Sequence, residues 1–175
     1  FKPFSFEEQE QIISSIPGNQ LPEVMCGGST TNSLAAASNL GSKCGLICQL
    51  GNDDRGSLYV DNLKDNGIEP LNNFHHESIK TGRCLVFITP NSERTMGTYL
   101  GASERLVDNA DFISHANNAK IIFSEGYQFT SNENYHAFLN ILKGCSKEIR
   151  FALSLSDPGV VNAFRERFEE VISIR

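Results

Sequence analysis

Short apolar runs alternate with helix-length segments along most of the chain, and this alternation limits the folds available to it. The segments follow one another as strand 44–51, helix 53–66, strand 120–124, helix 132–143, strand 150–155 and helix 159–172. Parallel strands require a long crossover between them, and a helix usually provides it and covers one face of the sheet. The sequence therefore predicts an α/β fold in which a mostly parallel sheet is flanked by helices.

Two further strand-like runs, at residues 82–89 and 95–100, interrupt this alternation. They are separated by residues 90–93, a turn-rich connector of the kind that joins two antiparallel strands. An extended stretch at residues 22–26 adds a third run earlier in the chain. We expect a small antiparallel β structure at the periphery of the sheet, with strands near 20–26 and 82–100.

The composition limits the partners of the chain. It has 175 residues, enough for one domain, with a net charge of -6 and basic residues scattered singly, so we expect neither nucleic acid nor an anionic membrane as a partner. Its apolar runs are far shorter than the roughly 20 residues that span a bilayer. The five cysteines are odd in number and lie mostly in apolar runs, as reduced thiols do, which predicts a cytoplasmic protein.

The segment Gly-Gly-Ser-Thr-Thr-Asn at residues 27–32 carries the clearest chemical signal. The consecutive Gly27 and Gly28 let a ligand approach the backbone, the following helix offers unpaired N–H groups, and Asn32 supplies a donor and an acceptor. These groups suit a neutral ligand with several hydroxyls. The glycines could instead form only a tight turn before a capped helix, and their spacing does not match the common phosphate-binding loops.

The order of this segment and its neighbours resembles the PfkB family of carbohydrate kinases. In that family a Gly-Gly-x-x-x-Asn segment leads into an alanine-rich helix that ends in Leu-Gly, as residues 27–41 do here. Further similar segments follow in family order at 51–56, 65–68, 81–84, 89–96, 99–102, 125–127 and 155–158. The segments within 81–102 are similar to the lid hairpin of the adenosine-kinase-like branch, and the likeness covers nearly the whole chain.

The resemblance implies a ribokinase-like fold and a role for each candidate residue. Gly27, Gly28 and Asn32 would hold hydroxyls of a sugar or nucleoside, over which the hairpin closes as a lid. Arg94 matches a lid arginine that lies near the transferred phosphate in related kinases, where a guanidinium suits the developing charge. Tyr127 would stack on a base or sugar. Arg94 could equally be a solvated turn residue, and Tyr127 a core aromatic.

The resemblance also implies ATP and Mg²⁺ as cofactors, although their site is not expected here. The chain has no Gly-Ala-Gly-Asp segment, which in the family neutralises phosphoryl charge and carries the general base. Residues 1–175 are therefore expected to form a partial ribokinase-like domain, from which the ATP-binding carboxyl-terminal half is absent. We expect the parent protein to phosphorylate a hydroxyl of a sugar or nucleoside, and this chain to be inactive alone.

Other functions remain open on the sequence alone. The chain could belong to a non-catalytic homologue that binds a metabolite at the same site, or it could be an α/β domain that uses the hairpin for protein interaction. In the family the lid often also pairs subunits, and an exposed antiparallel edge favours such pairing, so the resemblance implies a possible homodimer.

Two pairs of polar residues favour structural roles. Adjacent imidazoles at His75 and His76 diverge, and no second cluster of ligands has matching spacing, so we expect no protein-bound metal. Asp53 and Asp54 fit the first turn of a helix, where negative charge is favourable, better than a catalytic pair.

Overall fold

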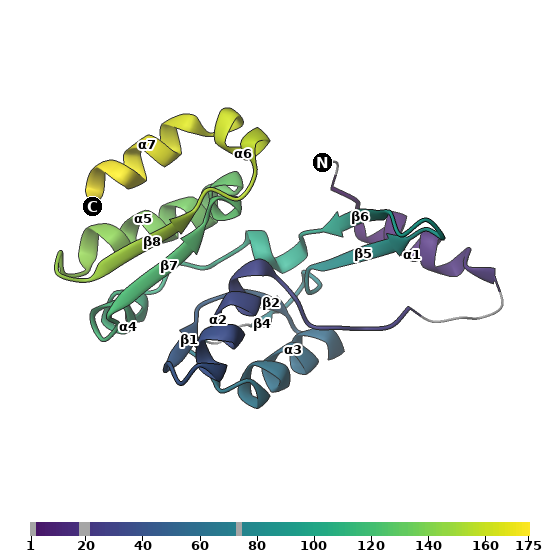
Figure 1. Cartoon of the computed structure of the whole chain (residues 1–175), viewed down its shortest axis with the longest axis horizontal. Helices are drawn as coiled ribbons and strands as arrows, with labels where there is room; N and C mark the ends of the chain where they lie inside the picture. Colours follow the sequence, from purple (N-terminus) through teal and green to yellow (C-terminus); the bar gives the residue numbers. More distant parts are fainter. Residues whose placement is uncertain (1–2, 18–21, 73–74) are drawn as a thin grey trace.

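The computed structural model in Figure 1 describes residues 3–17, 22–72 and 75–175. The helices are α1 (Phe6–Ser14), α2 (Ser29–Asn39), α3 (Asp54–Asp65), α4 (Asp111–Asn117), α5 (Asn132–Gly144), α6 (Pro158–Ala163) and α7 (Arg165–Ile174), with 3-10 helices η2 (Gly101–Glu104) and η3 (Gly126–Thr130). The strands are β1 (Cys44–Leu46), β2 (Leu50–Gly51), β3 (Ile68–Pro70), β4 (His75–His76), β5 (Arg83–Ile88), β6 (Arg94–Tyr99), β7 (Ile121–Glu125) and β8 (Arg150–Ser154). None of the helices described is long and apolar enough to cross a membrane.

The parallel pairing expected from the alternating pattern is confirmed. Strand β1 pairs with β3, β2 with β4 and β7 with β8, each pair in parallel. Helix α3 follows β2 and precedes β3, and α5 connects β7 to β8, so each is a crossover helix of the expected kind. Residues 68–70, 75–76 and 111–117 form elements that the sequence pattern did not predict.

Three expected elements differ from the structure. The strand expected over 44–51 is interrupted at Cys48, whose backbone N–H and C=O bond the side chain of Asn72 instead of a neighbouring strand. The helix expected over 159–172 is divided at Phe164, where φ is -123°. The strand expected near 20–26 is wrong for residues 22–26, which are extended and mostly exposed without a strand partner, while residues 20–21 lie outside the described part of the chain.

Three apolar clusters hold the helices against the parallel strands, and two of them lie nearest the site elements. The first joins α5, α7 and η3 around Phe129, which is fully buried and contacts Tyr135 and Phe168 edge to face. The second joins α3 to β1, β2 and β3 around Leu63 and Ile68, which are 0% and 1% exposed. Burial of such side chains is the main source of folding free energy.

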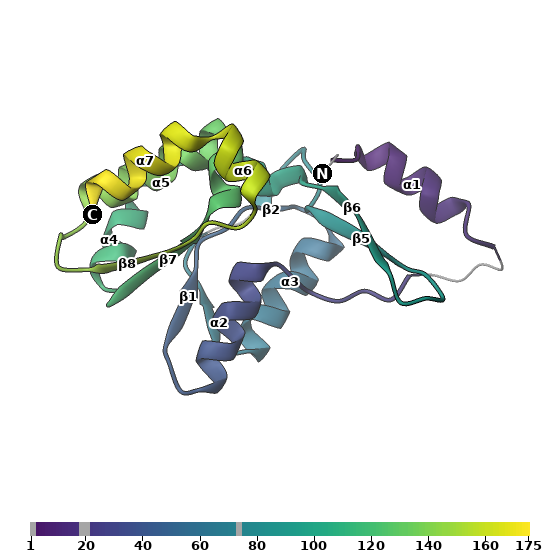
Figure 2. The same ribbon diagram turned by 45° about the horizontal axis from the view of Figure 1, so that its top comes forward.

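The antiparallel hairpin expected within 82–100 is confirmed as β5 and β6. Helix α1 covers one of its faces, where the fully buried Gln9 donates from Nε2 to the carbonyl oxygens of Gly97 at 2.8 Å and Arg83 at 3.3 Å. Gln9 therefore contacts both strands at once. Figure 2 shows α1 on one side of the hairpin and α2 and α3 on the other.

The second face of the hairpin is uncovered. Directly opposed residues of antiparallel strands share a face, so Val86, Met96 and Ile88 lie together, on the side away from the Gln9 contacts. Their side chains are 49%, 55% and 74% exposed. This apolar face, which we call the open hairpin face, has no covering element among the described residues.

Asp53 joins the start of α3 to the base of the hairpin. Its carboxylate accepts hydrogen bonds from the N–H of Gly56 at 2.9 Å and from the N–H and hydroxyl of Thr81 at 2.9 and 2.7 Å. Burial opposes the charged carboxylate, but these hydrogen bonds from Thr81 and Gly56 outweigh it and lower the pKa of Asp53. The backbones meet closely here, since a Cβ on Gly51 would lie 2.5 Å from the Thr81 nitrogen.

Replacing Asp53 by alanine should lower the free energy of unfolding by roughly 2 kcal/mol, because a helix cap and the acceptor of two Thr81 donors are lost together. Urea denaturation of the complete protein measures this change. Because the native pKa of Asp53 is lowered, its contribution is present above about pH 4 and is lost as the pH falls through that lowered value. Asp54→Ala serves as the control, because Asp54 is the exposed neighbour of Asp53. Equal losses of unfolding free energy in the two variants would contradict the structural role assigned to Asp53.

Candidate functional site

The candidate residues Gly27, Gly28 and Asn32 lie in one turn at the start of α2, which we call the glycine turn (residues 27–32). Gly28 is the N-cap of the helix with φ of +106°, a conformation that other residues rarely adopt. A Cβ on Gly27 would meet no atom within 4 Å, so the backbone is open to an approaching ligand. The expected glycine turn before a helix is confirmed.

The first turn of α2 keeps its backbone N–H groups and the Asn32 side chain available. Gly28 has no side chain with which to cap the helix, and the N–H groups of Ser29, Thr30 and Thr31 have no acceptor among the described residues. The exposed side chain of Asn32 likewise makes no hydrogen bond within the described structure. Free N–H donors beside an amide can bind the hydroxyls of a neutral ligand.

Two hydrogen bonds connect the glycine turn to neighbouring elements. The Ser29 hydroxyl donates to Oε2 of Glu125 at 2.5 Å, at the carboxyl end of β7. The Thr31 hydroxyl is hydrogen-bonded to the hydroxyl of Tyr59 on α3. The turn therefore lies at the carboxyl end of a parallel strand, which is where open α/β sheets bind ligands.

Glu125 is a candidate that the sequence analysis did not select, although it noted the segment 125–127. Its side chain is 8% exposed, and within the described structure it accepts a hydrogen bond only from Ser29. A buried carboxylate requires donors, and one of its oxygens is free to accept from a further hydroxyl. An acidic residue directly after a buried apolar strand was the available signal.

The structure places Tyr127 in the segment that follows Glu125, which contacts the glycine turn, and does not bring Arg94 to the turn. Tyr127 lies in η3, two residues beyond Glu125, and its side chain is 47% exposed, so it is not a core aromatic. Arg94 begins β6 at the distal end of the hairpin, opposite Ile88. Its side chain is exposed and forms no hydrogen bond or ion pair with any described residue.

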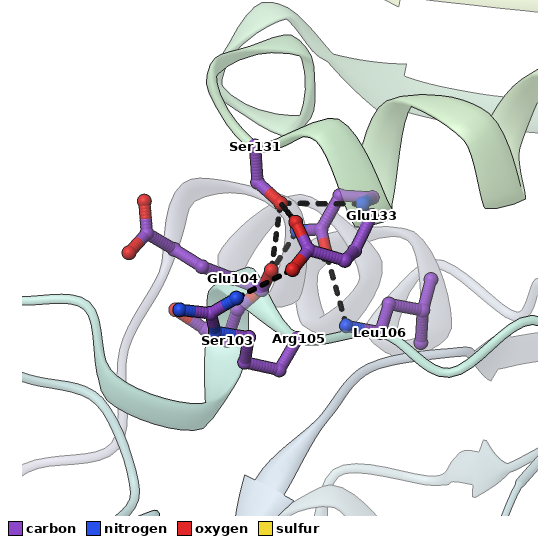
Figure 3. Close-up of polar contacts among 7 residues, drawn as sticks. Ser103, Glu104, Arg105, Leu106, Ser131 and Glu133 are labelled. Atoms are coloured by element: carbon purple, nitrogen blue, oxygen red, sulfur yellow. Dashed lines mark hydrogen bonds and ion pairs between the residues drawn. The ribbon is translucent and has the colours of Figure 1, made fainter.

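Polar contacts hold the segment that follows the hairpin against the start of α5 (Figure 3). Ser131, the N-cap of α5, donates its hydroxyl to the carbonyl oxygen of Glu104 at 2.6 Å, and the Asn134 side chain accepts from the N–H of Leu106 at 3.0 Å. An ion pair between Arg105 and Glu133 and a hydrogen bond from Asn134 to Ser103 complete the set. The exit of the hairpin is thereby fixed near the carboxyl end of β7.

A depression of about 410 Å³ lies beside these contacts, and none of the residues 27–32 lines it. His76 and His136 are among its lining residues. The Nδ1 atom of His76 accepts from the N–H groups of Ser78 and Ile79 at 3.3 and 3.2 Å, so this ring closes a turn after β4. No group of three or more His, Cys, Asp or Glu side chains in the described ranges is arranged to hold a metal ion.

Comparison with known proteins decides the family. The model of the pfkB family of carbohydrate kinases matches residues 19–174. The chain belongs to this family. A ribokinase of Mus musculus is 30% identical over 95 residues, which cover 51% of this chain and 29% of that protein. A ribokinase of Dictyostelium discoideum is 26% identical over 166 residues, covering 91% of this chain and 51% of that protein. The chain therefore spans about half of the length of these relatives or less.

Solved structures confirm the ribokinase-like fold for this pfkB-family chain. An adenosine kinase from Sinorhizobium meliloti superposes with a TM-score of 0.84 at 24% identity, covering 97% of this chain and 51% of that chain. A probable sugar kinase from Rhizobium etli gives 0.85 at 24% identity, covering 98% and 51%. An adenosine kinase from Schistosoma mansoni in complex with adenosine gives 0.80 at 21% identity, covering 97% and 50%. The chain therefore contains roughly half of the fold.

Proposed function

We propose that the complete protein is a kinase that transfers a phosphoryl group from ATP to a hydroxyl of a sugar or nucleoside, and that this chain supplies the acceptor-binding part. The observation that carries the proposal is the glycine turn. Its open backbone, unpaired N–H groups and exposed Asn32 amide lie beside the buried carboxylate of Glu125. Such a set matches vicinal hydroxyls, because each hydroxyl both donates and accepts a hydrogen bond.

Among possible acceptors we favour a nucleoside. The exposed ring of Tyr127 offers a surface on which a base or a sugar ring can stack. The open hairpin face offers an apolar cover, and we propose that the hairpin closes over the bound acceptor and excludes water from it. Adenosine kinases among the structures of the same fold support this choice.

We propose ATP and Mg²⁺ as the cofactors of the complete protein because the family consists of carbohydrate kinases. The described residues do not fit either group, since they form no cluster of metal-binding side chains and include no Gly-Ala-Gly-Asp segment. The role proposed for this chain is therefore limited to holding and covering the acceptor and to supplying Arg94, and we do not expect the chain alone to phosphorylate the acceptor. All five cysteines are free, which supports the proposed cytoplasmic location.

Gly27→Ala should separate acceptor binding from folding. The added Cβ meets no protein atom, so the free energy of unfolding should stay within about 0.5 kcal/mol of the wild-type value. The methyl group would occupy the space through which the acceptor approaches the backbone, so the acceptor KM should rise roughly tenfold or more. Kinase assays of the complete protein with adenosine, ribose and fructose measure the effect.

The control for this variant is Asn39→Ala, at the other end of α2. The proposal fails if the wild-type protein phosphorylates none of the three acceptors. If Gly27→Ala and the control have the same acceptor KM, the glycine turn is not the acceptor site.

Arg94 is proposed as a catalytic residue that stabilises the transferred phosphoryl group once the hairpin has closed. Its exposed side chain has no partner among the described residues and is free to reorient. Arg94→Ala should lower kcat roughly 100-fold and leave the acceptor KM nearly unchanged, because the interaction forms only in the transition state. Steady-state kinetics of the complete protein measure this, with the exposed Arg55→Ala as control. An unaltered kcat in Arg94→Ala would favour the solvated-turn role.

We further propose a homodimer formed through the hairpin. The outer edge of β5 has no strand partner among the described residues, whereas the carbonyl oxygen of Thr98 on β6 accepts from the Phe4 N–H at 2.8 Å. An unpaired strand edge favours association through its backbone groups, and a charged side chain placed on such an edge opposes it. Light scattering of the complete protein should give the mass of two chains, and Ile88→Glu should reduce it to one. A monomeric wild-type protein would argue against this assembly.

A further inference from the structure

The two sides of the glycine turn are both connected to the same part of α3. The Thr31 hydroxyl is hydrogen-bonded to the Tyr59 hydroxyl, and Thr31 is only 6% exposed. On the other side of the glycines, the Cys26 thiol lies 3.9 Å from the carbonyl oxygen of Leu58. Residues 58 and 59 of α3 therefore contact residue 26, directly before the two glycines, and residue 31, three positions after Gly28.

The glycine turn cannot fix its own direction. Gly28 makes no side-chain cap, and its φ of +106° lies in a region where glycine has wide freedom. A Cβ on Gly28 would lie 3.9 Å from both Thr31 Oγ1 and Tyr59 Oη, so the turn passes directly over this pair of hydroxyls. Neighbouring elements that hold the turn therefore contribute to the orientation of its free N–H groups.

Tyr59 is well suited to hold the turn because its own position is fixed. Its ring packs against the cluster that contains Leu46, Leu50, Leu63 and Ile68. Burial is the main cause that raises the pKa of Tyr59 to about 12, so the hydroxyl remains protonated at neutral pH. A hydrogen bond between two neutral hydroxyls on a packed ring constrains position without adding charge to the acceptor site.

We propose that Tyr59 is a positioning residue for acceptor binding, which acts through Thr31 to aim the N–H groups at the start of α2 and the Asn32 amide at the acceptor. This inference rests on the proposed function and adds a residue that acts through the protein rather than on the acceptor. Glu125 holds the same turn through Ser29, but its free oxygen is open to the acceptor itself. Tyr59 has its hydroxyl engaged by Thr31 and acts only on the protein.

The test compares Tyr59→Phe with Tyr135→Phe in the complete protein. Both substitutions remove one phenolic hydrogen bond, but the hydroxyl of Tyr135 contacts Glu170 in the carboxyl-terminal cluster. Tyr59→Phe should raise the acceptor KM roughly 3- to 10-fold, the loss expected for one neutral hydrogen bond, and should leave the KM for ATP unchanged. Tyr135→Phe should leave both constants unchanged.

Partner variants decide whether the effect passes through Thr31. Thr31→Val should raise the acceptor KM as Tyr59→Phe does, and the double variant should be no worse than either single one, because both remove the same bond. Thr31→Ser retains the hydroxyl and should restore the wild-type KM. Additive effects of the two substitutions, or equal effects of Tyr59→Phe and Tyr135→Phe, would overturn the proposal.

Hydrogen exchange provides a measurement that does not depend on the acceptor. The Asn32 N–H bonds the carbonyl oxygen of Gly28 at 2.9 Å and closes the first turn of α2. Tyr59→Phe should speed exchange at this amide while Tyr135→Phe leaves it unchanged, and unchanged exchange in Tyr59→Phe would overturn the positioning role. If no acceptor is phosphorylated by the wild type, the proposed function fails, and the exchange result still decides whether Tyr59 holds the turn.

Discussion

The three hydrogen bonds accepted by Asp53 determine how the hairpin is placed on the α/β body. One of them caps α3, and the two from Thr81 fix the backbone immediately before β5. Gly51 and Gly56 allow the backbones to approach closely enough for these bonds to form. Helix α3 also carries Tyr59, so the element that fixes the base of the hairpin also holds the glycine turn. The relative position of the turn and the hairpin is thus transmitted through one helix.

The sequence predicted the parts of the fold that depend on local patterns. The alternation of apolar runs and helix-length segments identified β7, α5 and β8 closely, and the turn-rich residues 90–93 identified the hairpin. It failed where tertiary hydrogen bonds replaced local ones. Cys48 is removed from strand pairing by Asn72, which is 24 residues away and gives no local signal. Residues 22–26 form no strand because they have no described partner to pair with, and a pairing partner cannot be read from a short segment.

In the candidate site too, local features could be predicted from the sequence and tertiary contacts could not. Gly27, Gly28 and Asn32 could be recognised because their chemistry resides in one short segment and in a family resemblance. The contacts that hold this segment could not, since Ser29 and Glu125 are 96 residues apart and Thr31 and Tyr59 are 28 apart. Periodicity identifies which face of a helix is buried, but it does not identify the partner of a single hydroxyl. Site residues that bind a ligand are therefore easier to find from sequence than the residues that orient them.

The buried Gln9 has a mechanical consequence. A two-stranded hairpin is marginally stable by itself in water, and the buried amide of Gln9 ties α1 to both of its strands. The helix and the two strands are therefore expected to move as one unit in the closure proposed above. If the hairpin closes as proposed, helix α1 moves through the solvent with it, so the rate of closure depends on the drag of this helix as well as on the two strands.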